Sequence, residues 1–196
     1  MPHLPGRYWN SLAVILLLLA ADRPAHSDDA KPLEEPPAVG DTARDLKLES
    51  VEGKKIRRHE LPKQGPGVVV VLRGYPGYQC PLCTAQVAGL RGEVDAFRSA
   101  GANVVLVYPG SADELKERAK EFLKGGSLPA PLTLVLDPDY EFVTSYALRW
   151  DAPNETAYPS TFVIDRDNKV LFSKVSKKHG GRSKVKDVIT ALPKKP

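Results

Sequence analysis

Cysteine and histidine are scarce in this chain of 196 residues, which has two cysteines and four histidines. A structural zinc site needs four ligands, and there is no second cysteine pair to complete one. Beyond the N-terminal segment only His59 and His179 remain, far apart and without the spacing of metal ligands. We therefore expect no bound metal and no other cofactor.

The chain also lacks a strong net charge, which is +4. Removing residues 1–27 takes away two arginines and one aspartate and leaves +3. So small a charge argues against a nucleic-acid partner. The basic stretch at residues 173–195 is interpreted as a solvated helix face and chain end, with a membrane surface or an acidic partner as the weaker alternative.

Long hydrophobic runs are absent except near the N-terminus, where residues 12–21 are apolar. This run is too short for a comfortable transmembrane span. It follows the basic Arg7 and precedes small residues at 25–27, a pattern that predicts a secretory signal over residues 1–27. The proline-rich residues 28–40 then form a linker. Export to the periplasm or the extracellular space would let a disulfide persist, whereas an uncleaved signal would anchor the protein at a membrane.

Residues 41–193 are expected to form one α/β domain with a central sheet flanked by helices. The predicted strands are a hairpin over 46–61 that turns at Glu52-Gly53, buried strands at 68–72, 103–108 and 132–136, and a hairpin over 160–175 that turns at Asp167-Asn168. The predicted helices are one whose buried face runs Cys83, Val87, Leu90, Val94 and Phe97, one over 111–125 with a Ser111/Glu114 capping box, a short one over 138–148, and a closing one over 183–192.

Both cysteines lie in the stretch "VVVVLRGYPGYQCPLC", where Cys80 and Cys83 follow a strand and open a helix. Pro81 suits the first helical position, and the free N–H groups and dipole of a helix start favour a thiolate. Cys80 is expected at the cap, nearer solvent, and Cys83 at the head of the buried face. This geometry favours Cys80 as the attacking sulfur and Cys83 as the resolving one. Half of a metal site and two inert buried thiols are the alternatives.

A second motif, "YPSTFVID", places Pro159 just before a strand. We predict a cis bond before Pro159, which would bring backbone beside the cysteine pair. A trans proline at a strand edge is the alternative.

Over about residues 39–192 these motifs, with "VGDTARDLKLESVEGKKIRRHEL" and "LVLDPDYEFVTSYAL", resemble the thioredoxin-like superfamily. More narrowly, the chain is similar to the redoxin or alkyl hydroperoxide reductase–thiol-specific antioxidant family, the peroxiredoxin-like proteins. The resemblance implies a thioredoxin-like fold with a central mixed sheet and a site at the start of the first long helix.

The resemblance gives two assignments for the attacking sulfur. In the peroxiredoxin pattern of Pro, three residues, Thr or Ser, two residues and the peroxidatic Cys, Pro76 begins the frame, Cys80 replaces the hydroxyl residue and Cys83 becomes peroxidatic. In thioredoxin-like oxidoreductases the first cysteine, Cys80, attacks. Peroxiredoxins also carry an arginine where this chain has Pro159, and the nearest substitutes, Arg73 and Arg149, do not fit that position.

The sequence therefore predicts an exported thiol-disulfide oxidoreductase or peroxiredoxin-like antioxidant enzyme. Its partners would be an external thiol reductant and a disulfide or hydroperoxide substrate. A thiol peroxidase with Cys83 as the peroxidatic cysteine is the alternative within enzymes. A metal-handling protein, similar to the copper chaperones of this fold, and a non-catalytic binding protein are the alternatives of another class.

Overall fold

The computed structural model describes residues 1–2, 32–57 and 65–194. Most of the predicted signal segment, the start of the predicted linker and the end of the first predicted hairpin therefore lie outside the described residues. In the part that is described, no helix has the length and apolar character needed to cross a membrane.

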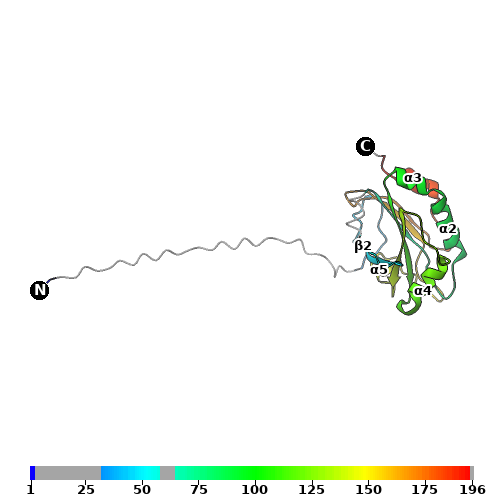
Figure 1. The fold of residues 1–196 in the computed structure, drawn as a ribbon, viewed down its shortest axis with the longest axis horizontal. Coiled ribbons are helices and arrows are strands. Elements are labelled where there is room, and N and C mark those ends of the chain that lie inside the picture. The colour runs from blue at the N-terminus through cyan, green and yellow to red at the C-terminus, as the bar shows by residue number, and fades with distance from the viewer. Residues whose placement is uncertain (3–31, 58–64, 195–196) are drawn as a thin grey trace. The chain divides into compact units, whose positions relative to one another are not determined.

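The chain divides into two units, and the second, Lys31–Pro196, contains the described fold. The second unit contains a seven-stranded mixed sheet with the order β2-β1-β5-β4-β3-β6-β7 (Figure 1). Its central strands β3, β4 and β5 are parallel, and the other neighbouring pairs are antiparallel. The strands are β1 (Lys47–Ser50), β2 (Lys55–Arg57), β3 (Gly67–Val71), β4 (Asn103–Gly110), β5 (Leu132–Pro138), β6 (Ser160–Ile164) and β7 (Val170–Val175).

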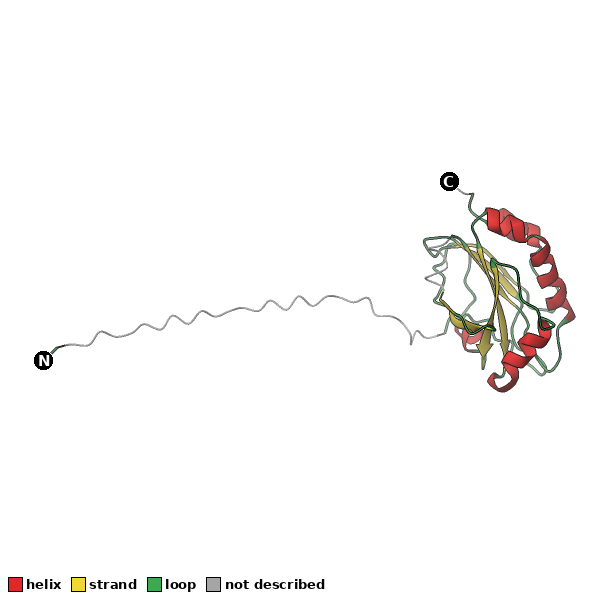
Figure 2. Cartoon of the chain, viewed as in Figure 1, coloured by secondary structure: helices red, strands yellow, loops and turns green. Residues whose placement is uncertain are grey.

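Five helices in the described residues cover the two faces of this sheet (Figure 2). They are α2 (Pro81–Gly92), α3 (Val94–Ser99), α4 (Ala112–Phe122), α5 (Glu141–Ser145) and α6 (Val185–Ala191). Helices α2, α3, α4 and α6 pack on one face and α5 on the other. The predicted α/β architecture and its mixed sheet are confirmed.

The apolar residues of β3 show why helices cover both faces of the sheet. All five of its residues are buried, and successive side chains point to opposite faces of the sheet. Val68 and Val70 belong to the buried cluster that includes residues of α2 and α4, whereas Val69 and Val71 belong to the cluster that includes residues of α5. Because β3 lies inside the sheet and is covered on both faces, its carboxyl end holds the segment that follows it in a fixed place.

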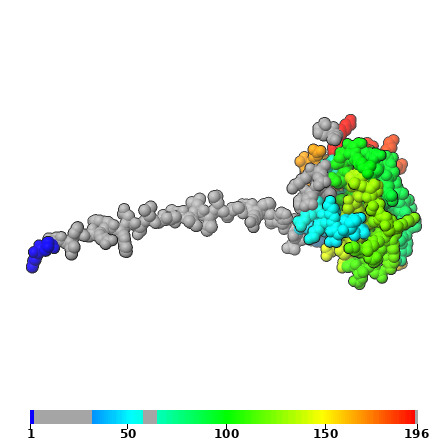
Figure 3. Space-filling view, in the orientation of Figure 1, coloured from blue at the N-terminus to red at the C-terminus, as the bar shows by residue number. Residues whose placement is uncertain are grey.

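The β1–β2 hairpin lies at one edge of the sheet, with β7 at the other edge, and is seen on the surface in Figure 3 (cyan). The predicted turns are confirmed at both hairpins. Gly53 has a φ of +86° between β1 and β2, and Asn168 has a φ of +65° between β6 and β7.

The single helix predicted from Cys83 to Phe97 is wrong in one respect, because two helices cover that span. Glu93 leaves helical geometry with φ −108° and ψ 20°, directly after Gly92, a residue of low helix propensity. The predicted face is nevertheless kept across the break, since Cys83 in α2 and Phe97 in α3 are both fully buried.

The capping box predicted for α4 is also wrong. Ser111 is the N-cap residue, but its side chain makes no capping hydrogen bond. The Ala112 amide instead donates to the Asp139 carboxylate at 3.0 Å, and Glu114 accepts from Arg118 at 2.7 Å. A carboxylate from the β5–α5 connection thus takes over the cap.

The described end of the predicted linker is attached to the domain. The Leu33 amide donates to the Ser145 carbonyl at 3.1 Å, and the Pro37 carbonyl accepts from the Ser173 hydroxyl at 2.7 Å. Residues 33–37 therefore follow the surface of the domain and contact both α5 and β7.

Asp137 provides a test of how the α5 face is held. Its buried carboxylate accepts the Phe142 and Val143 amides at 2.7 and 3.1 Å. Asp137→Ala leaves both amides without that acceptor, so we expect the free energy of unfolding in urea to fall by about 1–3 kcal/mol. The exposed Asp113→Ala serves as control, with a change of about 0.5 kcal/mol or less. Equal effects of the two substitutions would contradict this account.

Candidate active site

The two cysteines lie at the start of α2, where the chain leaves β3 and crosses to the helical face. Cys80 is the N-cap residue, Pro81 opens the helix as predicted, and Cys83 lies in the first turn. Both are free thiols. Cys80 is only 3% exposed and Cys83 is fully buried, so the expectation that Cys80 lies nearer solvent holds by a small margin only.

The segment between β3 and α2 is held in place by contacts to β4. Gly74 has a φ of +70°, and a side chain there would collide with the Pro109 carbonyl oxygen, so only glycine fits. The Tyr108 hydroxyl donates to the Gln79 side-chain carbonyl at 2.8 Å, next to Cys80. These contacts fix where the two sulfurs stand.

Backbone N–H groups point at both sulfurs. The Cys83 amide donates to the Cys80 sulfur at 3.4 Å, and the Arg73 amide, just after β3, donates to the Cys83 sulfur at 3.3 Å. Amide donors of this kind stabilise a thiolate more than a thiol. The site therefore favours negative charge before any side chain is considered.

An arginine from a distant segment supplies the positive charge. The half-buried Arg182, in the loop between β7 and α6, places Nη2 at 3.4 Å from the Cys83 sulfur and 3.7 Å from the Cys80 sulfur. Its Nη1 donates to the Gln86 side chain at 2.6 Å, and its Nε donates to the His179 carbonyl at 3.2 Å. One guanidinium thus bridges the two sulfurs and is held on two further sides.

The two thiols share one proton in this environment. The hydrogen bond from Cys83 lowers the pKa of Cys80 most, burial opposes it, and with the backbone amides and Arg182 the pKa falls to about 5. The same hydrogen bond, together with burial, raises the pKa of Cys83. This hydrogen bond favours Cys80 as the thiolate and Cys83 as the thiol that donates to it.

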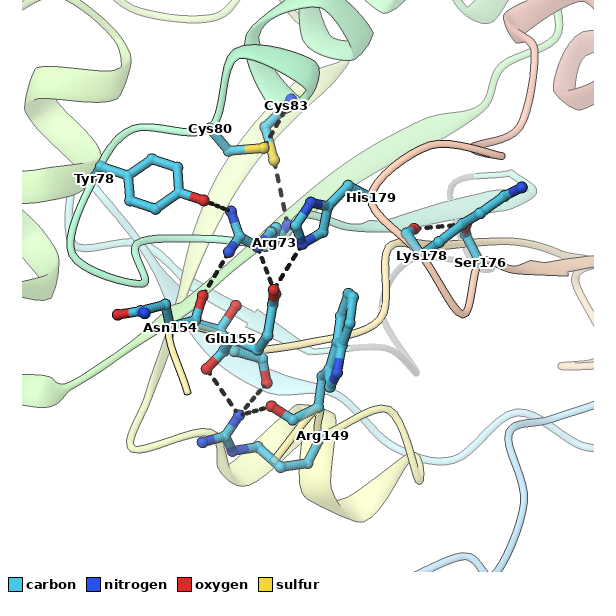
Figure 4. A network of polar contacts seen from close by, with 12 residues as sticks. Arg73, Tyr78, Cys80, Cys83, Arg149, Asn154, Glu155, Ser176, Lys178 and His179 are labelled. Atoms are coloured by element: carbon cyan, nitrogen blue, oxygen red, sulfur yellow. Dashed lines mark hydrogen bonds and ion pairs between the residues drawn. The ribbon is translucent and has the colours of Figure 1, made fainter. Parts of the chain in front are cut away.

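The side chain of Arg73 points away from the sulfurs into a buried ion pair (Figure 4). Its Nε donates to Glu155 at 2.6 Å, and its other nitrogens donate to the Tyr78 hydroxyl and the Asn154 carbonyl. The second oxygen of Glu155 contacts the His179 ring nitrogen at 2.7 Å. Arg73 thus meets the dithiol through its backbone amide, and its guanidinium belongs to the supporting network.

Arg149, the other arginine suggested by the sequence, contacts backbone carbonyls and an aromatic ring. Its Nη1 donates to the Trp150 and Thr156 carbonyls at 2.6 Å each, and its guanidinium lies over the Tyr140 ring. Pro76 lies in the β3–α2 segment and lines a cavity of about 470 Å³ that also touches Glu155.

The predicted cis bond before Pro159 is wrong. In the described residues the cis bond precedes Pro131, and the Tyr158–Pro159 bond is trans. The Pro159 carbonyl accepts the Ser176 amide at 2.9 Å, which extends the β6–β7 pairing by one step. The chain enters β6 in extended form, so no tight turn is required there.

A groove of about 380 Å³ runs between α2 and residues 180–185. Arg182 lines it together with the exposed Leu82 from the first turn of α2, so the groove leads from the surface to the guanidinium that bridges the sulfurs. Its lining is Leu82, Ala85, Gln86, Gly89, Gly180, Gly181, Arg182, Ser183, Lys184 and Val185. In the described part of the chain, no group of three or more His, Cys, Asp or Glu could hold a metal ion.

A thioredoxin-like sheet with a dithiol at the start of the helix after its central strand defines a thiol-dependent oxidoreductase of the peroxiredoxin-like class. The chain belongs to the AhpC/TSA family, whose model matches residues 39–173.

Individual relatives agree with this membership. The chain is 29% identical over 151 residues to a predicted peroxiredoxin of Mycobacterium tuberculosis, covering 72% of this chain and 87% of that protein. It is 26% identical over 141 residues to peroxiredoxin Bcp of Escherichia coli K12, covering 69% and 83%.

Solved structures support the fold. Peroxidoxin BcpB of Mycobacterium tuberculosis superposes with a TM-score of 0.62 at 22% identity, over 79% of this chain and 95% of that one. A peroxiredoxin-like protein of Aquifex aeolicus gives a TM-score of 0.64 at 17% identity, over 80% and 86%.

Sequence reasoning missed Arg182, because the basic stretch from 173 onward was interpreted as solvated. The available signal was "HGGR": Gly181 has a φ of +76°, which turns the loop back toward α2 just before Arg182. Glu155 was missed as well, because a lone carboxylate in a loop gives no indication of a buried arginine partner.

Arg182→Met should raise the pKa of Cys80 by about 1–2 units, because the thiolate loses its nearest cation. The check is the rate of alkylation by iodoacetamide as a function of pH, whose midpoint should move upward by that amount. Lys184→Met removes the same charge from an exposed residue of the same loop and should leave the midpoint unchanged. An unshifted midpoint in Arg182→Met would show that the guanidinium does not act on the dithiol.

Proposed function

We propose that this chain is a thiol peroxidase, which reduces a hydroperoxide with the Cys80–Cys83 dithiol and is reset by an external thiol reductant. The observation that carries the proposal is the Arg182 guanidinium beside both sulfurs. Peroxide cleavage leaves negative charge on the departing oxygen, and a fixed cation at that place stabilises the transition state. The names of the peroxiredoxin relatives support the same substrate class.

The reaction balances with the groups present. The Cys80 thiolate attacks one peroxide oxygen, a sulfur–oxygen bond forms, and the oxygen–oxygen bond breaks. The departing oxygen takes a proton and leaves as an alcohol or water, and Cys80 becomes a sulfenic acid. The Cys83 thiol then attacks that sulfur and water leaves, so a disulfide remains and two electrons have passed to the hydroperoxide. The thiol reductant returns the disulfide to the dithiol.

Protonation supports the assignment of Cys80 as the attacker. The attacking group must be a thiolate, and Cys80 has the lowered pKa while Cys83 has the raised one. The peroxiredoxin sequence frame, counted from Pro76, assigns the opposite roles. The proposal follows the charge distribution of the site.

Single-cysteine variants test both the activity and the assignment. We expect wild type to consume hydrogen peroxide and form an internal disulfide, Cys83→Ser to form a sulfenic acid on Cys80, and Cys80→Ser to lose at least about 100-fold in peroxide rate. Stopped-flow peroxide consumption, with mass spectrometry of a trapped sulfenic acid, measures these outcomes. A sulfenic acid on Cys83 in Cys80→Ser would reverse the roles, and no peroxide consumption by wild type would end the peroxidase proposal.

A disulfide reductase is the second candidate function, favoured by one observation. A low-pKa cysteine at the N-cap with a buried partner in the first turn also suits attack on a disulfide. Insulin-disulfide reduction by the same variants separates the two functions, because a peroxidase would leave insulin intact under conditions in which it consumes peroxide.

Export is a further part of the proposal and is supported by the sequence pattern at residues 1–27 alone. Expression of the full chain in a Gram-negative host should yield a periplasmic protein whose N-terminus lies near Asp28. Subcellular fractionation with N-terminal sequencing measures this. A cytoplasmic protein that retains Met1 would refute export.

A further inference from the structure

A closed ring of contacts passes through the dithiol and the network beneath it. The Cys83 sulfur accepts the Arg73 amide, the Arg73 guanidinium binds Glu155, and Glu155 binds the His179 ring. The His179 carbonyl then accepts from Arg182, whose guanidinium returns to the Cys83 sulfur. The members come from four separate segments of the chain. Glu155 joins the two branches of this ring. One branch, the Arg73 arm, runs from Glu155 through Arg73 to Cys83, and the other, the His179 arm, runs through His179 and Arg182 to Cys83.

Glu155 is placed to hold these arms firmly. Its side chain is 10% exposed, and its two oxygens are divided between Arg73 at 2.6 Å and His179 at 2.7 Å. Burial raises its pKa, but the hydrogen bonds from both partners prevail and hold the pKa below its usual range, so the carboxylate is charged at neutral pH. A buried charge with two partners fixes their positions more strongly than an exposed pair does.

The His179 arm carries this constraint to the loop that bears Arg182. The His179 ring is tilted against the Trp150 ring at 5.2 Å, and Trp150 is in turn stacked on Tyr158. The His179 ring therefore lies between Glu155 and the stacked Trp150 and Tyr158 rings, while the backbone carbonyl of His179 accepts from Arg182 Nε. The Ser183 hydroxyl anchors the far end of the loop by donating to Thr161 at 2.8 Å.

We propose that Glu155 is a positioning residue, which through Arg73 and His179 holds both sets of donors against the dithiol. It touches neither sulfur and acts only through the two arms. The inference rests on the proposed function only in naming the dithiol as the reacting group.

The sign of one measurement separates positioning from plain electrostatics. Removing a negative charge from the neighbourhood of a thiolate lowers the pKa of the thiol by itself. Loss of positioning has the opposite effect, because Arg182 and the Arg73 amide no longer stand against the sulfurs. Glu155→Gln should therefore raise the pKa of Cys80 from about 5 by about one unit.

Alkylation by iodoacetamide across pH, with the ultraviolet absorbance of the thiolate as a second readout, measures this shift. At about pH 5.5 a rise of one unit slows alkylation about threefold. Glu117→Gln, an exposed carboxylate paired with Lys120, is the control and should not move the midpoint. An unchanged or lowered midpoint in Glu155→Gln overturns the proposal. Because neither readout requires turnover, the result stands apart from whether the chain is a peroxidase.

A second pair of variants keeps the test valid if Glu155→Gln folds poorly. His179 is 46% exposed, so its replacement removes little buried surface. His179→Ala and His179→Gln are both uncharged, and only glutamine retains a hydrogen-bond donor for Glu155. Positioning predicts that the alanine variant raises the midpoint clearly more than the glutamine variant does. Equal midpoints would contradict the role of the His179 arm.

Discussion

The site depends on one constraint: two sulfurs, almost completely buried, share a negative charge that donors of the protein itself must stabilise. The start of α2 and the segment just after β3 each provide an amide, and the β7–α6 loop provides a guanidinium. Each of these donors comes from a different part of the chain. The central strand β3, the turn at Gly74 and the helices packed on the sheet therefore bring these donors together.

The positive charge beside the sulfurs comes from a segment far along the chain. The position just before β6, where the peroxiredoxin pattern has an arginine, holds Pro159, and that residue continues the sheet pairing. The guanidinium comes instead from Arg182, beyond the 39–173 segment that the family model matches. Most of the sheet and the first turn of α2 thus lie within the matched segment, whereas the loop that bears the cation lies after it.

Elements with strong local patterns could be predicted from the sequence. The valine run of β3, the two hairpin turns and the apolar spacing from Cys83 to Phe97 are periodic signals that burial enforces, so their types and approximate positions emerged correctly. The proximity of Cys80 and Cys83 followed from their spacing.

Residues that act over long sequence separations could not be predicted in the same way. Arg182 lies about one hundred positions from the sulfurs, and the Arg73–Glu155 pair forms because β3 and the segment before β6 are neighbours in the sheet. The capping of α4 by Asp139 fails to show locally for the same reason.

The burial of the dithiol has a kinetic consequence. The groove beside Leu82 reaches the Arg182 guanidinium but neither sulfur, and a reductant that carries its own thiol on a protein surface is too large to enter it. For such a partner to reach the sulfurs, the first turn of α2 or the loop that bears Arg182 must open. Oxidation itself favours this opening, because a disulfide carries no charge and releases the guanidinium from its ion partner. The enzyme would then react quickly with oxidant and be regenerated slowly, and the opening of these few residues would set its turnover.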